Sequence, residues 1–337
     1  MSIIQATQAE IAAIWPTLNA GDTLQLSGEF VDWRPGKRTF DKRLVVDASQ
    51  AVVRGLYGGT LNGVDWHGGI IKAGDARTIG FRIDHADNFS ISGVTLDDDK
   101  LTGNGLQFYM GSNVVIDGVT GKGFLDAIVL ARIDGFAVRN FDLSGMAADC
   151  VDLYNVANGV CEDGKVGDRN PASAKHPDAV QLANLGNDGY LCTENVTVQR
   201  IAVNAPNMQG VTAFYHSDIT VPNQRYKNIT FRDLDIEVGY PQACALYGCD
   251  GGLVENVSVR TSAGATYMAM IHVGDGCTNV ERYNNTAESY AGKPAVSDPP
   301  RSAPIRAPAA ILGDLVANAS AGAALMAELQ ASIGAQP

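Results

Sequence analysis

The chain has 337 residues, of which 37 are glycine and only 7% are aromatic, and its formal net charge is −12. Abundant Gly together with many Val, Ile, Thr, Asn and Asp residues favours short strands joined by tight turns over long helices. The acidic balance argues against nucleic acid as a partner, because phosphate binding needs clustered Lys and Arg. Residues 1–21 contain neither a basic segment with a long apolar core nor a membrane-spanning run, so we expect no secretory signal and no membrane insertion.

The first predicted element is a short N-terminal helix over residues 7–18. Thr7 stands three positions before Glu10, which is the spacing of a capping box. Trp15 and Leu18 fall where they can cover the open end of a β structure, whose unpaired edge needs such cover. A strand is expected from Ala20 on, and residues 1–49 together are assigned to an N-terminal cap helix with the first strands.

A short phrase recurs through residues 50–290; it opens with Asn or Gly and continues with alternating apolar and polar residues. The copies read NFSISGVTL from Asn88, NVVIDGVTG from Asn113, GFAVRNFDL from Gly135, NGVCEDGKV from Asn158, NVTVQRIAV from Asn195, NITFRDLDI from Asn228, NVSVR from Asn256 and NVERY from Asn279. Their starts are 25, 22, 23, 37, 33, 28 and 23 residues apart. A base period of about 23 residues is too short for a propeller blade and fits one coil of a β-solenoid.

A second short strand precedes each phrase, so one coil contains two strands and an Asn turn. Asn suits this turn because it tolerates the left-handed backbone conformation that a tight corner requires. Successive coils then pair in parallel at a spacing of about 4.8 Å. The sequence therefore predicts an all-β fold, a single-stranded right-handed parallel β-helix (solenoid) over residues 50–290, with an N-terminal capping helix and a C-terminal helix.

Three carboxylates open consecutive coils in the same frame. The strands DAIVL, DCVDL and DAVQL begin with Asp126, Asp149 and Asp178. The position three residues further on points outward, because side chains alternate along a strand, and in neighbouring coils it holds Gln107, Asp152, Gln181 and Thr212. Carboxylates one coil apart, about 5 Å, repel one another, which raises at least one pKa and keeps a proton available, or else attracts a cation. A protonated acid beside an ionised base is what glycoside cleavage requires.

A purely structural role for these carboxylates stays open. An Asp at the start of a strand commonly accepts hydrogen bonds from nearby backbone, so the three residues can form a ladder without catalytic duty. No cofactor is expected, with a divalent cation at the Asp ladder as the alternative. The six cysteines lack metal-ligand spacing and are interpreted as small buried residues, while a Cys244–Cys249 disulfide stays open.

Two insertions supply basic and aromatic residues beside the ladder. The loops at residues 168–176 and 217–227 lengthen two coils, and long excursions from one edge of a solenoid build groove walls. The candidate substrate-binding residues there are Lys175, His176, His216 and Arg225, of which the two His titrate near neutral pH. Tyr154 and Tyr215 follow ladder strands, as Tyr109 does, and are candidates to stack on sugar rings.

The C-terminal part has a different composition. Residues 291–308 are rich in proline and are predicted to be a stiff linker, and residues 309–337 are predicted to be an Ala-rich helix with an apolar stripe. The stripe fits a cap or packing arm and an oligomerisation helix equally well. A homotrimer and attachment to a larger particle through the termini both stay open.

The three Asp coils resemble the pectin-degrading polygalacturonases of the pectate-lyase-like β-helix superfamily, in which consecutive coils carry NTDG, DDC and GHG motifs. Here FLDAI around Asp126 looks like the first motif, AADCV around Asp149 looks like the second, and HPDAV around Asp178 stands where the third would be. Ala148 replaces the first Asp of the family's pair, and Asp178 stands in place of its His. The resemblance implies an inverting hydrolysis with Asp149 as the general acid and Asp126 positioning or activating water.

A looser resemblance is to phage-type spikes that attach to bacterial surface glycans, because this chain is an acidic β-helix with helical appendages at its ends. We therefore weigh two functions. The first is a polysaccharide-cleaving enzyme, a glycoside hydrolase rather than a lyase, and the second is a non-catalytic receptor-binding spike. A polysaccharide is the partner in both. The compartment stays open between the cytoplasm, a phage-like particle released by lysis, and export by a non-classical route.

Overall fold

The computed structural model describes residues 2–75, 78–171, 177–184, 192–214, 225–274, 276–290, 293–294 and 298. Residues 1–299 form one compact unit, and residues 300–337 are a separate unit that lies outside the described residues. The expected C-terminal helix at 309–337 falls entirely in this second unit. Among the described residues, no helix is long and apolar enough to cross a membrane.

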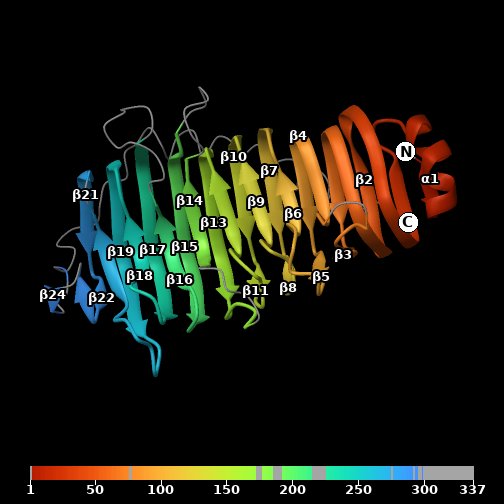
Figure 1. The fold of residues 1–337 in the computed structure, drawn as a ribbon. Helices are drawn as coiled ribbons and strands as arrows, with labels where there is room; N and C mark the ends of the chain where they lie inside the picture. The colour runs from red at the N-terminus through yellow and green to blue at the C-terminus, as the bar shows by residue number, and fades with distance from the viewer. Residues whose placement is uncertain are drawn as a thin grey trace, which may run out of the picture. The chain divides into compact units, whose positions relative to one another are not determined.

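The described chain is nearly all strand, with one short α-helix near its start (Figure 1). The elements are β1 (Ile3–Ala6), α1 (Gln8–Ile14), a 3₁₀ turn (Trp15–Thr17), β2 (Thr23–His67), β3 (Ile70–Lys72), β4 (Phe81–Ser92), β5 (Thr95–Asp97), β6 (Leu106–Phe108), β7 (Gly111–Asp117), β8 (Thr120–Lys122), β9 (Ile128–Ala131), β10 (Ile133–Arg139), β11 (Asp142–Leu143), β12 (Val151–Tyr154), β13 (Ala157–Val166), β14 (Asp178–Ala183), β15 (Glu194–Ala205), β16 (Gln209–Ala213), β17 (Tyr226–Val238), β18 (Gln242–Leu246), β19 (Cys249–Thr261), β20 (Met270–Val273), β21 (Thr278–Tyr283), β22 (Thr286–Ala287), β23 (Ser289–Tyr290) and β24 (Lys293–Pro294).

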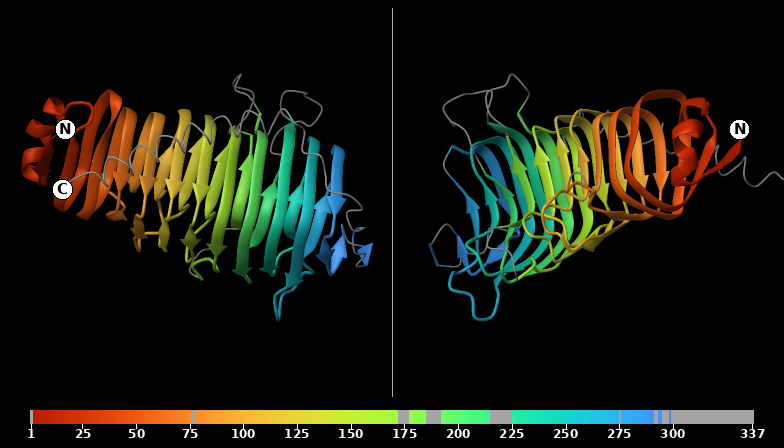
Figure 2. Two further views of the ribbon diagram at one scale, coloured as in Figure 1. Left: turned by 180° about the vertical axis from the view of Figure 1, so that it is seen from behind. Right: turned by 45° about the vertical axis from the view of Figure 1, so that its right-hand side comes forward.

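The strands pair with strands of the next coil rather than with their neighbours in sequence. One stack runs β6, β9, β12, β14, β16, β18 and β20, and a second runs β4, β7, β10, β13, β15, β17, β19 and β21, with parallel pairing throughout both stacks. Figures 1 and 2 show the coils following one another in chain order from α1 to β24. The nearly all-β architecture of parallel strands that the sequence predicts is therefore present, and parallel pairing already begins between β1 and β2.

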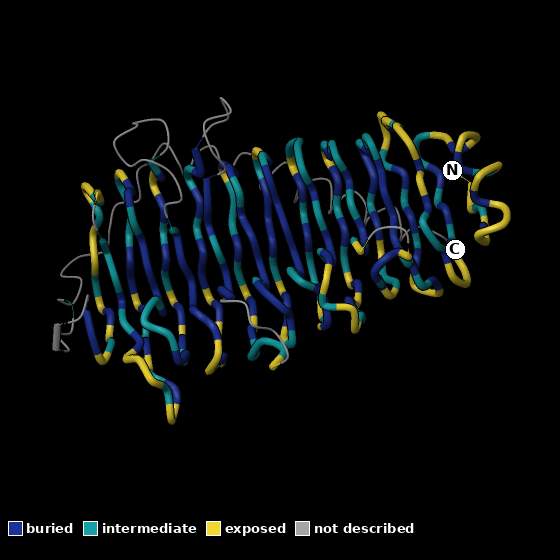
Figure 3. The backbone as a smooth tube through the Cα atoms, viewed as in Figure 1, coloured by how far each residue is buried: buried dark blue, intermediate teal, exposed yellow. Residues whose placement is uncertain are grey.

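The core runs through the middle of the coils as a continuous buried column (Figure 3). Near the N-terminus it consists of aromatic rings in mutual contact. Ring centroids lie 6.2 Å apart between Trp33 and Trp66, 5.0 Å between Trp66 and Phe81, and 6.1 Å between Phe81 and Phe108. Each inward side chain thus packs on the coils above and below it, which is why the coils stack in register.

Helix α1 begins with the expected capping box. The backbone N–H of Thr7 donates to Glu10 at 3.0 Å, and the Thr7 hydroxyl donates to the same carboxylate at 2.8 Å. The α-helix ends at Ile14 rather than continuing to residue 18, because Pro16 cannot donate the next backbone hydrogen bond. The chain tightens into a 3₁₀ turn there, and Trp15 remains buried against the first coil.

The Asn turns take the left-handed conformation that the repeat predicts. Asn88, Asn113, Asn158, Asn195 and Asn228 have φ between 49° and 56°. Their amides form a ladder, in which Asn195 donates to Asn158 at 2.9 Å and Asn228 donates to Asn195 at 2.9 Å. This confirms the structural interpretation of the Asn repeat.

The sequence repeat predicts Asn256 at the same corner as Asn228, and this prediction is wrong. Asn256 does not extend the ladder of Asn228; it donates to Asp233 at 2.8 Å and lies in a second left-handed ladder with Asp233 and Asn284. In the coil that follows Asn228, Gly251 takes the corresponding corner of the first ladder. Each long strand has two such corners about five residues apart, and an Asn fits either one.

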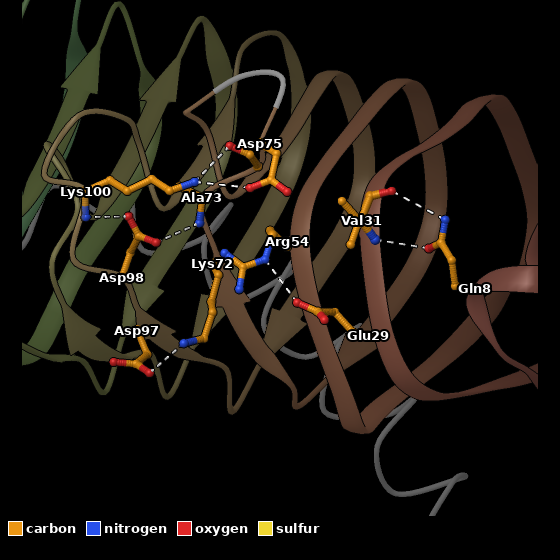
Figure 4. Close-up of polar contacts among 11 residues, drawn as sticks. Gln8, Glu29, Val31, Arg54, Lys72, Ala73, Asp75, Asp97, Asp98 and Lys100 are labelled. Atoms are coloured by element: carbon orange, nitrogen blue, oxygen red, sulfur yellow. Dashed lines mark hydrogen bonds and ion pairs between the residues drawn. The ribbon is translucent and has the colours of Figure 1, made fainter.

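The N-terminal coils are also tied together by charged side chains on their outer surface (Figure 4). Arg54 pairs with Glu29 at 3.0 Å, and Lys72 pairs with Asp97 at 3.2 Å. The backbone N–H of Ala73 donates to Asp98 at 3.2 Å. Each of these bonds joins residues about one coil apart, so the charges in this region stabilise the stacking.

Candidate functional site

The outer face of the first stack carries the residues that the repeat alignment brings together. Strand register places Gln107, Val129, Asp152, Gln181 and Thr212 in one row across β6, β9, β12, β14 and β16. The alignment of these positions is therefore correct. Gln107 lies at one end of the row, separated from Asp152 by the buried side chain of Val129, and it accepts a hydrogen bond from Arg82 at 3.3 Å.

Asp126, Asp149 and Asp178 form a second row, bordering the first, in which each coil bonds to the next. The backbone N–H of Asp149 donates to Asp126 Oδ1 at 3.1 Å, and the N–H of Asp178 donates to Asp149 Oδ1 at 2.6 Å. These are the bonds of a structural ladder. Asp126 and Asp149 nevertheless remain partly exposed, so their carboxylates combine a structural bond with access to solvent.

Asp152 is buried, although its position in the strand predicts an outward side chain that meets substrate. Only 1% of it is exposed, and one oxygen from each of Asp126, Asp149 and Asp152 lies within 4.8 Å of the other two. Burial raises the pKa of Asp152 well above its usual range, and the charges of Asp149 and Asp126 add to the rise. A hydrogen bond with Asp149 favours the protonated form. Asp152 therefore keeps its proton to a higher pH than an exposed Asp does.

Tyr154 lies on the same strand as Asp152 and hydrogen bonds to it, which partly offsets the rise in the pKa of Asp152. Burial raises the pKa of the Tyr154 phenol, so the hydroxyl keeps its proton and acts as the donor. Tyr154 is only half-buried. Its ring is thus the part available to a ligand, while its hydroxyl orients the acid cluster.

Asp178 and Thr212 are also buried, although the sequence predicts a catalytic carboxylate at Asp178 and a substrate-binding residue at Thr212. Asp178 is 1% exposed and Thr212 is 0% exposed. The Thr212 hydroxyl donates to Asp178 Oδ1 at 2.9 Å, and the Gln181 amide donates to Asp178 Oδ2 at 2.9 Å. Burial and the charge of Asp149 raise the pKa of Asp178, and these two hydrogen bonds oppose the rise. Thr212 therefore positions Asp178 and does not contact a substrate directly.

Of the residues that the two insertions were expected to supply, the structure describes only Arg225. Lys175, His176, Tyr215 and His216 lie outside the described residues. Arg225 is described, but it donates to the backbone of Gly276 and to Thr278 Oγ1, the latter at 3.1 Å, several coils from Asp149. Arg225 is thus engaged at a corner of the C-terminal coils and is not part of the carboxylate cluster.

Several outward residues of the same stack were not singled out from the sequence. On the N-terminal side, the guanidinium carbons of Arg82 and Arg132 lie 5.5 Å and 5.0 Å from the ring centroid of Tyr109. On the C-terminal side, Tyr247 stacks on Phe214 with centroids 5.6 Å apart. Extending the strand alignment to GFRIDH and CALYG would have placed Arg82 and Tyr247 on this face.

The face therefore has an acidic centre with aromatic residues on both sides of it. Asp152, whose pKa is raised, is a candidate proton donor in this cluster, and Asp126 supplies a second carboxylate next to it. The nearest oxygens lie within 4.8 Å of one another, whereas an inverting pair keeps its carboxyl groups roughly 6.5–9.5 Å apart to hold a water. This spacing does not favour the inverting arrangement that the polygalacturonase resemblance implies.

The cysteines and the surface depressions of the described residues lie apart from the three clustered carboxylates or are buried. All six cysteines are free, five of them buried and Cys277 half-buried, which agrees with small structural residues. A surface depression lined by Asp142, Lys165 and Arg260 lies on the second stack, away from the three clustered carboxylates.

Neither a family model nor a curated protein sequence matches the chain. Among solved structures, an alginate lyase from Paenibacillus sp. str. FPU-7 is similar with a TM-score of 0.53 and 13% identity, over 84% of this chain and 96% of that one. The Dettilon tailspike protein is similar with a TM-score of 0.35 and 10% identity, over 81% of this chain and 62% of that one. Likeness at such low identity concerns the fold alone. The chain thus shares with the alginate lyase a fold built of parallel β-strands.

Proposed function

We propose that this chain binds a polysaccharide along the outer face of β6, β9, β12, β14 and β16 and cleaves it hydrolytically. The observation that carries this proposal is the cluster of half-buried Asp126, half-buried Asp149 and buried Asp152, in which one oxygen of each carboxylate lies within 4.8 Å of the other two. A long face with aromatic residues on both sides of an acid cluster suits an extended sugar chain, since aromatic rings pack on sugar faces.

The fold is compatible with this class of ligand. The similar alginate lyase acts on a polysaccharide, according to its name, and the parallel coils here offer a face of comparable kind. The coils are taken to be right-handed, because a crossover between parallel strands has this hand in nearly all proteins.

The proposed reaction uses the cluster as a retaining pair. Asp149, supplied with a proton through its hydrogen bond with Asp152, protonates the glycosidic oxygen as the bond from that oxygen to the anomeric carbon breaks. Asp126 attacks the anomeric carbon and forms a glycosyl ester. Water then hydrolyses the ester, with Asp149 as the base that recovers a proton. Asp178, Thr212 and Gln181 position Asp149 through the bond from the Asp178 backbone N–H.

Binding without cleavage is the second candidate. It is favoured by the ladder bonds, since Asp126 and Asp149 each accept a backbone N–H from the next coil. A carboxylate held by such a bond has a structural reason to be there. In this case the same face would attach the protein to a surface glycan, as a spike does.

The experiment is a comparison of Asp149→Asn with wild type on a panel of plant and capsular polysaccharides. Asn keeps the acceptor for the Asp178 N–H but carries no proton to donate, so we expect the release of new reducing ends to fall by at least about 100-fold. The matched control is Asp142→Asn, which alters an exposed carboxylate on the second stack.

Three outcomes separate the candidates. New reducing ends without the ultraviolet absorbance of an unsaturated sugar support hydrolysis, and their loss in Asp149→Asn assigns it to this cluster. Absorbance of unsaturated sugar replaces the hydrolase with a lyase. Retained binding without either signal supports the non-catalytic attachment protein.

A further inference from the structure

The carboxylate cluster contains a buried oxygen that the protein does not satisfy. Asp152 Oδ1 is inaccessible to solvent and has no hydrogen-bond partner, although the residue is only 1% exposed. A buried polar oxygen without a partner is costly, and native proteins rarely leave one without a functional reason. Asp152 is at the same time one of the three residues whose oxygens gather within 4.8 Å.

The groups around this oxygen are of one chemical kind. Asp126 precedes β9, Asp149 precedes β12, and Asp178 begins β14, so three neighbouring coils each present a carboxylate. Tyr154, from β12, adds a neutral hydroxyl. Both carboxylate oxygens of Asp178 already accept hydrogen bonds, from Thr212 and Gln181. Asp126, Asp149 and Asp152 are thus the members suited to a shared ligand.

An oxygen-only donor set selects a hard cation. Thiolate and imidazole ligands, which would favour zinc or copper, are absent from this group of three. Calcium accepts several carboxylates in irregular geometry and completes its shell with water, whereas magnesium prefers one or two carboxylates and an octahedral water shell. Asp126 and Asp149 are partly exposed, so water or sugar hydroxyls can reach an ion that they hold.

We propose that Asp126, Asp149 and Asp152 bind one calcium ion, with one oxygen from each carboxylate as a ligand. This calcium site does not depend on the proposed hydrolysis. The cation then satisfies the buried oxygen of Asp152.

The test is calorimetric titration of metal-free, full-length protein with calcium chloride. One ion per chain is expected, because the three carboxylate oxygens gather at a single point.

Two variants locate the site. Asp152→Asn and Asp126→Asn should each weaken calcium binding by at least about tenfold, as expected for loss of one charged ligand. Asp142→Asn, outside the cluster, should bind as wild type does. Absence of heat at millimolar calcium, binding that survives unchanged in Asp152→Asn, or magnesium binding as tight as calcium would overturn the proposal.

The calcium site and the proposed hydrolysis fail separately. A protein that binds calcium but cleaves nothing contradicts the hydrolysis and leaves the calcium site in place.

Discussion

At the scale of single residues, Asp152 combines poor solvation with strong coupling to its neighbours. It is buried next to two other carboxyls, and its pKa is raised first by desolvation and then by the charges of Asp149 and Asp126. Such a residue weakens the fold at neutral pH and is retained where chemistry or ligand binding needs it. Its neighbour Cys150 shows the same environment, since burial and these carboxylates raise the pKa of its thiol.

Substituting Asn for Asp152 should stabilise the metal-free protein. The pKa of Asp152 is higher in the folded than in the unfolded protein. The contribution of protonated Asp152 to the free energy of unfolding is therefore complete below about pH 3.9 and is lost as the pH rises through the folded-state pKa. At pH 8, Asp152→Asn is therefore expected to raise the free energy of unfolding by about 0.5–2 kcal/mol. Near pH 4 the difference should vanish. Urea unfolding of both proteins at both pH values measures this difference. If Asp152→Asn were less stable than wild type by more at pH 8 than at pH 4, the raised pKa of Asp152 would be contradicted.

At the scale of elements, the coil is held by its left-handed Asn corners. Asn195 lies in the middle of the first ladder, where it donates to Asn158 and accepts from Asn228. Its φ of 56° is a conformation that most residues avoid. The corner thus has two separate requirements, a backbone that tolerates positive φ and an amide that bridges the coils above and below.

The two requirements can be separated by substitution. Asn195→Ala should cost about 3–4 kcal/mol, from a left-handed penalty of about 1–2 kcal/mol and the loss of two hydrogen bonds worth about 1 kcal/mol each. Asn195→Gly should cost less, because glycine removes only the amide bonds. Chemical denaturation measures both. If Gly destabilises as much as Ala, the corner is not determined by its backbone conformation.

At the scale of the whole molecule, a solenoid needs its first coil covered. Trp15 closes this end: it packs edge-on against Trp33 with centroids 5.2 Å apart, and its indole N–H donates to Pro35 O at 2.7 Å. Arg38 lies over Phe40 and donates to the backbone of Trp15 at 2.6 Å. The cap is therefore locked to the first coil by both packing and hydrogen bonds.

Removing this indole should open the first coil. Trp15→Ala is expected to cost about 3–5 kcal/mol and to promote association through the uncovered strand edge. Ile3→Ala, at a residue that is 69% exposed, is the matched control and should change stability by less than about 0.5 kcal/mol. Thermal unfolding with light scattering distinguishes them. If the two variants had equal unfolding temperatures and equal light scattering, Trp15 would not protect the first coil.

Much of the architecture could be derived from the sequence, because each coil of a repeated structure carries a similar sequence pattern at a similar interval. The Asn phrases predicted the corners, and the strand alignment placed Asp126, Asp149 and Asp178 in one row and Asp152, Gln181 and Thr212 in the next. Both depend on local rules, namely side-chain alternation along a strand and the tolerance of Asn for positive φ. Such rules act within one coil and need no knowledge of the others.

The depth of each side chain was decided only by the tertiary structure. Alternation shows which side of a strand a residue takes, yet Asp152 and Thr212 point away from the core and are still buried. The corner of Asn256 was likewise settled by pairing with Asp233, because both corners accept Asn. The exposure of each side chain and the raised pKa of Asp152 depend on neighbours from other coils, and those distances arise only when the coils stack.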